Sequence, residues 1–288
     1  MTKSFARTFG QDIMRGEHVV GGGMSNPAQK LAPGGGGGGC WLGGEITESS
    51  DLYGQDTAGS GTSIFDPVLC EIAYRWFSPE GGLVLDPFAG GSVRGIVASK
   101  LGRRYIGCEL RSEQVAANRI QGADICGDTG PEWIQGDSAV IIPGLTEQAD
   151  FIFSCPPYGD LEVYSDNPAD LSTMPFEVFI SAYRRIISAS VANLKQNRFA
   201  CFVVGDFRCP KGFYRNFVGE TVMAFEAAGA RYYNEAILVT AVGSLPIRVG
   251  KQFSSGRKLG KTHQNILVFV KGDPKAATTV CKGPEDGN

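Results

Sequence analysis

The segment 83–92 constrains the fold more than any other part of this sequence. It begins with Leu83–Leu85, a short apolar run bounded by glycines on one side and followed by an acid and a proline. Such a run is typical of a central strand that is buried on both faces of an α/β sheet. Asp86 follows directly, at the carboxyl end of the expected strand, where open α/β sheets bind their ligands.

The residues after Asp86 predict a tight turn into a helix. Gly90 and Gly91 allow the backbone to turn sharply and to approach a ligand closely. Ser92 is suited to cap a helix over residues 93–101. A glycine turn alone also fits an ordinary loop, so its interpretation depends on the strands that follow.

Two further strands are expected to end in an acid at the same edge of the sheet. Residues 104–109 end in Glu109, and residues 133–137 end in Asp137. Glu109 lies 23 residues beyond Asp86. That separation is close to the spacing of about 20 residues at which an acid binds ribose hydroxyls in nucleoside-binding βαβ units. The alternative for Glu109 is a surface salt bridge.

A fourth expected strand, residues 150–154, leads into a Cys-Pro-Pro-Tyr loop at 155–158. Two consecutive prolines cannot donate to a sheet ladder or start a regular helix interior, so they fix a rigid, extended loop. A rigid loop at this edge suits a site that holds a planar ring between an aromatic face and a row of hydrogen-bond acceptors.

Apolar periodicity predicts the remaining elements of one α/β domain. A helix is expected to begin at Asp66-Pro67, which is a sequence suited to a helix start. The last two strands are expected to pair antiparallel at one edge of a mostly parallel sheet. The other expected elements are helices over 112–120, 176–194 and 217–228 and strands over 199–205, 232–242 and 264–270.

The two ends of the chain differ from this domain, which is expected to span 63–273. Residues 1–62 are rich in glycine, which predicts a partly flexible arm that either has no specific function or orders over a substrate. The candidates for such a contact are Arg7, Arg15, His18 and Trp41. Residues 274–288 are expected to be a disordered tail.

Composition argues against several classes of protein. No apolar run approaches the roughly 18 residues of a membrane span, and the first residues do not form a secretory signal, so we expect a cytoplasmic protein. The eight cysteines are scattered and the chain has two histidines. Neither a disulfide framework nor a metal site is therefore expected. Because the net charge is −3, any nucleic-acid surface must be a local basic patch.

One segment carries such a patch. Five cations fall within fourteen residues that contain no acid: Arg248, Lys251, Arg257, Lys258 and Lys261. The segment 244–262 is therefore expected to be a loop that contacts phosphates, with a basic, solvated hairpin as the alternative. The sites upstream favour the first interpretation.

The motif Asp-Pro-Phe-Ala-Gly-Gly-Ser at 86–92 and the later Pro-Pro-Tyr loop together resemble the amino-group DNA methyltransferases. These enzymes use S-adenosylmethionine to methylate N6 of adenine or N4 of cytosine, and they include phage-type and prophage-type DNA methylases. The resemblance spans residues 63–271, and the order of cofactor motif, catalytic motif and late basic region is also similar. It implies a Rossmann-like, seven-stranded class I methyltransferase sheet.

The resemblance also implies roles for individual residues. The glycine loop would hold the methionine end of the cofactor, Glu109 its ribose hydroxyls and Asp137 its adenine amino group. Tyr158 would stack on the extruded target base, while the carbonyl of Pro156 would accept a proton of its amine. The cofactor-binding candidates are Phe65, Asp86, Pro87, Phe88, Gly90, Gly91, Ser92, Glu109, Leu110 and Asp137, and the catalytic candidates are Ser154, Cys155, Pro156, Pro157 and Tyr158.

The sequence departs from that family at one catalytic position. The residue before Pro-Pro-Tyr is Asp, Asn or Ser in the family and Cys155 here. A thiol is a poor hydrogen-bond acceptor, which leaves three interpretations. The Pro156 carbonyl orients the amine, or Ser154 takes over through a local shift, or the chemistry is at another atom. A nucleophilic Cys155 would belong to the last, but the Pro-Cys context of cytosine-C5 enzymes is absent.

The implied activity is methyl transfer to an exocyclic amine of a base flipped out of double-stranded DNA. It needs no metal, and it would take place in a bacterial or phage-infected cell, with a homodimer as one possible assembly. One alternative is methylation of an RNA base or of a protein glutamine, although the basic segment argues against the protein substrate. The other alternative is a protein that binds the cofactor and DNA but has weak or no transferase activity. Cys155 is the reason for considering it.

Overall fold

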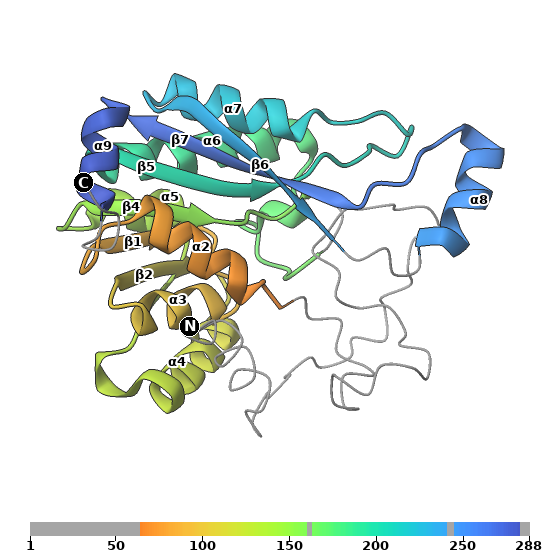
Figure 1. Cartoon of the computed structure of the whole chain (residues 1–288). Helices are drawn as coiled ribbons and strands as arrows, with labels where there is room; N and C mark the ends of the chain where they lie inside the picture. Colours follow the sequence, from red (N-terminus) through yellow and green to blue (C-terminus); the bar gives the residue numbers. More distant parts are fainter. Residues whose placement is uncertain (1–63, 160–162, 241–244, 283–288) are drawn as a thin grey trace, which may run out of the picture.

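The computed structural model describes residues 64–159, 163–240 and 245–282, without the side chains of 246–248. Strands in these ranges form one sheet in the order β3-β2-β1-β4-β5-β7-β6 (Figure 1). The strands are β1 Leu83–Asp86, β2 Arg104–Glu109, β3 Glu132–Gln135, β4 Ala149–Ser154, β5 Leu194–Val204, β6 Arg231–Val239 and β7 His263–Lys271.

The predicted seven-stranded, mostly parallel α/β sheet is confirmed. The strands from β3 to β5 pair parallel, and β6 and β7 form the expected antiparallel pair at one edge. β7 also pairs antiparallel with β5. The antiparallel strand therefore lies one position in from the edge, between β5 and β6.

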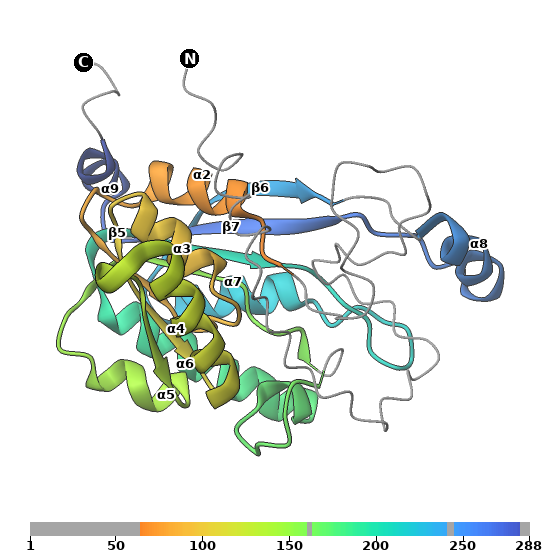
Figure 2. The same cartoon turned by 90° about the horizontal axis from the view of Figure 1, so that it is seen from below.

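Helices cover both faces of the sheet (Figures 1 and 2). α2, α3, α4 and α9 lie on one face, α5, α6 and α7 lie on the other, and α8 extends away from the sheet. Within the described ranges, no helix is long and apolar enough to cross a bilayer. The elements are α2 Pro67–Phe77, α3 Val93–Lys100, α4 Ser112–Cys126, η1 Gly127–Thr129, α5 Ser138–Ile141, η2 Ile142–Gly144, η4 Leu171–Thr173, α6 Phe176–Asn193, α7 Phe217–Ala227, α8 Leu245–Gly256 and α9 Pro274–Cys281.

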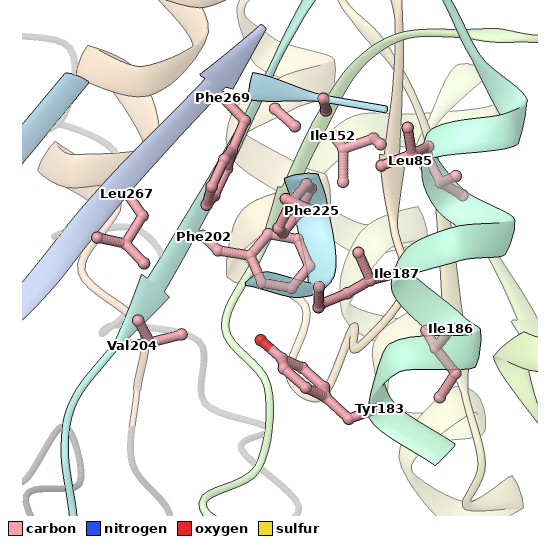
Figure 3. Close-up of a cluster of buried hydrophobic side chains, with 14 of the residues drawn as sticks. Leu85, Ile152, Tyr183, Ile186, Ile187, Phe202, Val204, Phe225, Leu267 and Phe269 are labelled. Carbon is pink, nitrogen blue, oxygen red and sulfur yellow. The ribbon is translucent and has the colours of Figure 1, made fainter. Parts of the chain in front are cut away.

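Alternate residues of the central strands feed two hydrophobic cores. Leu85, Ile152 and Phe202 belong to the core beneath α6 and α7 (Figure 3). Val84 and Phe151 belong to the core beneath α2 and α3. A parallel sheet covered on both faces needs apolar residues on both, which is why the continuous run at the start of β1 predicted a central strand. Burial of each large apolar side chain contributes about 1.5–3 kcal/mol.

The strand order places two loops at one point of the sheet. β1 is flanked by β2 on one side and by β4 on the other, so the order reverses between β1 and β4. Ligands of open α/β sheets bind outside the carboxyl ends of the strands at such a switch point. Asp86 ends β1 and Ser154 ends β4, so the glycine turn and the Cys-Pro-Pro-Tyr loop both begin there.

The start of α2 is as predicted. The Asp66 carboxylate accepts hydrogen bonds from the backbone N–H groups of Val68 at 2.8 Å and Leu69 at 3.4 Å. Pro67 occupies the first helical position, where its missing N–H has no intrahelical partner to lose.

Two predictions about the C-terminal part are wrong. Residues 274–281 form α9 rather than a disordered tail, because Asp273 caps the helix through the Ala276 N–H at 2.7 Å and Ala277 is fully buried. Residues 245–256 form α8 rather than a loop or hairpin, and apolar residues recur every four positions along it, at Leu245, Val249 and Phe253. The predicted arm over 1–62 lies outside the described residues.

Gly107 in β2 leaves no room for a side chain. A Cβ there would lie 2.8 Å from the Cβ of Ala89 and 2.9 Å from the hydroxyl of Tyr105, and both neighbours are buried. We predict that Gly107→Ala lowers the free energy of unfolding by about 1–3 kcal/mol, measured by urea denaturation. Gly144→Ala is the control, because no atom lies within 4 Å of its added Cβ. Its effect should stay within about 0.5 kcal/mol, and equal losses in the two variants would contradict the packing argument.

Candidate active site

Asp86 is fully buried at the end of β1, and four donors surround its carboxylate. Oδ2 accepts hydrogen bonds from Arg94 Nε at 2.6 Å and the Tyr105 hydroxyl at 2.8 Å. Oδ1 accepts from the Ser154 hydroxyl at 2.5 Å and the Phe88 N–H at 3.1 Å. The donors come from α3, β2, β4 and the turn after β1, so Asp86 ties these four segments together. It acts on a ligand through the segments that it positions.

Arg94 compensates the buried charge of Asp86. Its guanidinium also donates to the backbone carbonyls of Phe88 at 2.7 Å and Ala89 at 2.8 Å, and it lies 4.6 Å from the centre of the Phe65 ring. Burial alone would lower the pKa of Arg94, but the adjacent Asp86 carboxylate raises it above its ordinary value. Arg94 therefore stays charged, and it fixes the backbone that leads into the glycine loop.

The glycine loop is held on one side and open on the other. Gly90 has a φ of +50°, which favours glycine, and a Cβ added to Gly90 or Gly91 would meet open space. The Gly90 N–H donates to Glu109 Oε2 at 2.9 Å, and its carbonyl accepts from the Asn118 side chain at 2.7 Å. β2 and α4 thus hold the loop, while the open side can approach a ligand closely.

Glu109 ends β2, as predicted, and its side chain is mostly buried beside the half-buried Leu110. Its second oxygen accepts the N–H of Arg111 at 3.0 Å, whereas the Arg111 guanidinium lies 3.7 Å away. Burial raises the pKa of Glu109, and the N–H donors of Arg111 and Gly90 oppose that rise. Each carboxylate oxygen keeps a second lone pair, so Glu109 can still accept ligand hydroxyls.

The third predicted acid has a structural role as well. β3 ends two residues before Asp137, whose carboxylate caps α5 by accepting the Ala139 N–H at 2.8 Å. The next residue, Ser138, donates its hydroxyl to the Pro87 carbonyl at 2.6 Å. Asp137 therefore lies half-buried on a helix start that is bonded to the turn after β1.

The predicted cap by Ser92 is wrong. Ser92 precedes α3, but its hydroxyl donates to Gln121 of α4 and makes no bond to the helix N–H groups. Its backbone is already helical, with φ −75° and ψ −16°, whereas a capping residue is extended. Ser92 therefore fastens α3 to α4 and is itself buried.

The residues before the two prolines are arranged in order of increasing exposure. Ser154 is fully buried, and its hydroxyl oxygen accepts the Phe88 N–H at 3.2 Å while donating to Asp86. Cys155 is half-buried. In the loop itself, Pro156 is buried and Pro157 is half-buried. The hydrogen bonds of the Ser154 side chain are thus made with Asp86 and Phe88, in the segment that leads into the glycine loop.

Tyr158 is half-buried in an aromatic cluster. Its ring makes edge contacts with the rings of Phe207, at 6.3 Å between ring centroids, and of Phe217, at 6.0 Å. Its hydroxyl accepts a hydrogen bond from Gln264 Nε2 at 2.5 Å. Gln264 lies on β7 and is buried, and its Oε1 has no hydrogen-bond partner in the described structure.

Sequence reasoning did not single out Arg94 or Gln264. A lone arginine in the apolar stretch Val93–Ala98 was the signal for Arg94, since a buried cation requires a partner. Gln264 was the first residue of a predicted strand, and nothing local to it indicated a contact with Tyr158.

The predicted basic residues do not form one compact group. Lys258 and Lys261 are half-buried, and Lys261 Nζ lies 3.5 Å from the Asp206 carbonyl near the end of β5. Burial lowers the pKa of Lys261. Lys251 and Arg257 are exposed on and just beyond α8, and the side chain of Arg248 lies outside the described structure.

A family model described as DNA methylase matches residues 70–119. The match runs from α2 through the glycine loop and β2 into α4, so it contains both Asp86 and Glu109. The matched segment is thus similar to the corresponding part of DNA methylases. No curated protein matches its sequence.

Solved structures resemble this chain at low identity. TrmN from Thermus thermophilus is 16% identical with a TM-score of 0.48, over 72% of this chain and 49% of that one, so this chain spans about half its length. A methyltransferase from Pyrococcus furiosus is 16% identical with a TM-score of 0.47, over 73% and 84%. Magnesium protoporphyrin IX methyltransferase from Synechocystis PCC 6803, with bound cofactor, is 10% identical with a TM-score of 0.44, over 72% and 76%. Likeness at this level does not bear on the substrate.

The described residues fit S-adenosylmethionine, the cofactor that the resemblance implies. Open space borders Gly90 and Gly91, and the Glu109 carboxylate lies directly behind Gly90. Asp137, at the end of the next strand along the edge, keeps a half-buried carboxylate. A glycine turn followed by acids on successive strands is the arrangement that binds nucleoside ligands in open α/β sheets.

The Asp86–Arg94 pair gives a stability prediction. Arg94→Met leaves the buried Asp86 carboxylate without its cation, so it should lower the free energy of unfolding by about 3–5 kcal/mol. The double variant Asp86→Asn, Arg94→Met should lose less than the sum of the two single variants in chemical denaturation. Strictly additive losses would contradict the coupling.

The Gln264–Tyr158 bond gives a prediction that separates activity from stability. Gln264→Leu removes a donor and also an unpartnered buried acceptor, so the free energy of unfolding should change little. Losing the bond loosens Tyr158, so methyl transfer should fall by about tenfold, the equivalent of one hydrogen bond. Thermal unfolding and transfer of a labelled methyl group measure the two quantities. Unchanged transfer would show that Gln264 does not position the ring.

Proposed function

We propose that this protein is an S-adenosylmethionine-dependent methyltransferase that methylates an exocyclic amine, N6 of adenine or N4 of cytosine, on a base flipped out of double-stranded DNA. The observation that carries the proposal is the 2.5 Å hydrogen bond from Ser154 to Asp86. It fixes the start of the Cys-Pro-Pro-Tyr loop against the residue that positions the glycine loop. The DNA methylase match over residues 70–119 supports DNA as the substrate class.

The reaction requires the protein to position the amine and to supply hydrogen-bond acceptors. An amine conjugated to a heteroaromatic ring is a weak nucleophile, so its nitrogen must be held in line with the methyl group while its protons are drawn toward acceptors. S-adenosylmethionine, when bound, supplies the electrophilic methyl and a sulfur that leaves as a neutral thioether. The nitrogen gains the methyl group and gives up one proton, which passes to solvent. A nearby hydrogen-bond acceptor lowers the barrier by drawing that proton away from the nitrogen as the bond to the methyl group forms.

The structure favours the Pro156 carbonyl as the main acceptor. Ser154 could orient an amine only by giving up its bonds to Asp86 and Phe88, both at a fully buried position. Cys155 offers a thiol, which is a weak acceptor. A backbone carbonyl of a rigid Pro-Pro segment is a strong acceptor whose direction is fixed.

We infer that the flipped base stacks on Tyr158. Chemistry on a base inside a duplex requires extrusion, which costs a few kcal/mol. Stacking of a base on an aromatic ring returns about 1–3 kcal/mol. The edge contacts with Phe207 and Phe217 and the Gln264 hydrogen bond hold the Tyr158 ring in place, so little freedom is lost on stacking.

The test is incubation with tritiated-methyl S-adenosylmethionine and unmethylated genomic DNA, with RNA in parallel, followed by nucleoside mass spectrometry. We expect N6-methyladenine or N4-methylcytosine in DNA. Tyr158→Ala should reduce the product by about 10–100-fold, the loss of one stacking interaction. Tyr233→Ala, an exposed tyrosine on β6, is the matched control and should retain activity.

Cys155→Ser separates the amine mechanism from a nucleophilic cysteine. Serine is found at this position in the resembled family, so we expect the variant to stay active and to give the same product. Loss of activity together with C5-methylcytosine in the wild-type product would contradict the proposal. Label in RNA alone, or in neither polymer, would contradict DNA as the substrate.

A further inference from the structure

The loop between β5 and α7 forms a small hairpin over Phe207–Arg215. Arg208 and Tyr214 form an antiparallel bridge, and the Cys209 N–H donates to the Phe213 carbonyl at 2.8 Å. The Gly212 N–H closes the turn on the Cys209 carbonyl at 2.8 Å. The hairpin is thus a defined structure, and Figure 1 shows the loop after β5 running out toward α8.

The base of the hairpin packs on the Cys-Pro-Pro-Tyr loop. Phe207 is buried, and its ring contacts that of Tyr158. On the returning strand, the Arg215 N–H donates to the Phe207 carbonyl at 2.9 Å, and the Arg215 guanidinium lies 4.2 Å from the centre of the Phe176 ring. The hairpin therefore projects directly from the ring on which the target base would stack.

The far part of the hairpin exposes aromatic side chains. Phe213 is 73% exposed and Tyr214 is 48% exposed. The Arg208 guanidinium lies 3.9 Å from the centre of the Tyr214 ring and donates to the Gly212 carbonyl at 2.9 Å. The Arg208 side chain therefore holds the Tyr214 ring in place. Phe213, by contrast, exposes an apolar ring that has no polar group to hydrogen-bond with water.

Several cations on or beside the hairpin have no acidic partner among the described residues. Arg208, Lys211 and Arg215 of the hairpin form no ion pair among the described residues. Lys258, which follows α8, lies against the hairpin, since its Cε would be 3.1 Å from a Cβ on Gly212. It too has no acidic partner in the described ranges.

The cations at the opposite edge of the sheet behave differently. Arg104 pairs with Glu147, and both Lys195 and Arg198 pair with Asp150. Protein acids thus pair with these three cations, whereas Arg208, Lys211 and Lys258 have no acidic partner in the described ranges and are left for an external anion. A row of phosphates is such an anion.

We propose that the hairpin grips duplex DNA and that Phe213 enters the base stack as the target base leaves it. This inference rests on the proposed function and deepens it. Apolar side chains that insert between base steps offset the cost of unstacking and keep the duplex open. Phe213 is the exposed apolar residue of a hairpin that is rooted on Tyr158 and flanked by phosphate-binding cations.

The test compares two forms of one substrate, native unmethylated genomic DNA and the same DNA heat-denatured and kept single-stranded. A wedge matters only where a base must be extruded from a duplex. Phe213→Ala should therefore lower kcat/KM at least about tenfold on native DNA, which corresponds to 1.4 kcal/mol, and less than about twofold on denatured DNA. Phe213→Leu should retain part of the native-DNA activity, because leucine also fills the gap.

Two further variants separate a wedge from a loss of binding or of folding. Lys211→Ala, on the same hairpin, should weaken methylation of both DNA forms, because both carry phosphates. Trp76→Ala, on α2, removes an aromatic side chain that is 65% exposed and should leave both activities unchanged. Thermal unfolding and cofactor binding by calorimetry should match the wild type for Phe213→Ala.

Three outcomes would overturn the inference. Equal losses on both DNA forms, or no loss on either, would exclude a wedge while leaving the proposed function in place. Wild-type activity on denatured DNA alone would exclude it as well, because no duplex would be opened. Wild-type inactivity on both forms would overturn the proposed function and the wedge with it.

Discussion

The buried ion pair of Asp86 and Arg94 is the interaction on which the site depends. A carboxylate with no solvent exposure is stable only when it is paired and hydrogen-bonded, and Asp86 meets that condition with donors from four segments. The same pair fixes the carbonyls before the glycine loop and the serine before the Cys-Pro-Pro-Tyr loop. Neither loop can shift without disturbing this buried charge, so the glycine loop and the Cys-Pro-Pro-Tyr loop are held in one geometry.

The fold could be predicted because its signals are local. The apolar run of β1, the Asp66-Pro67 helix start and the alternation of strands and helices each act within a few residues, and all are found in the structure. The helices α8 and α9 were missed, because a basic composition and a terminal position were given more weight than apolar spacing and a cap at Asp273.

Partners within the site could not be predicted, because they are distant in sequence. Ser154 reaches Asp86 across 68 residues, and Gln264 reaches Tyr158 across 106. The end of each strand was foreseen, but which side chains share a hydrogen bond depends on the register of neighbouring strands. Asp86 illustrates the limit, since the motif placed it at the cofactor edge while the structure uses its carboxylate to hold the surrounding segments. In the same way, Lys195 pairs with Asp150 while Lys211 has no acidic partner among the described residues, although the two lysines look alike in the sequence.

We infer that the cofactor and the amine that accepts the methyl group meet between the glycine loop and the Cys-Pro-Pro-Tyr loop. A crystal structure with S-adenosylhomocysteine tests it most directly. We expect ribose hydroxyls on Glu109, backbone contacts at Gly90 and Gly91, an unbroken Asp86–Ser154 hydrogen bond, and a sulfur that faces the loop carrying Tyr158. A cofactor bound away from these glycines, or a Ser154 side chain released from Asp86 to face the acceptor site, would contradict it.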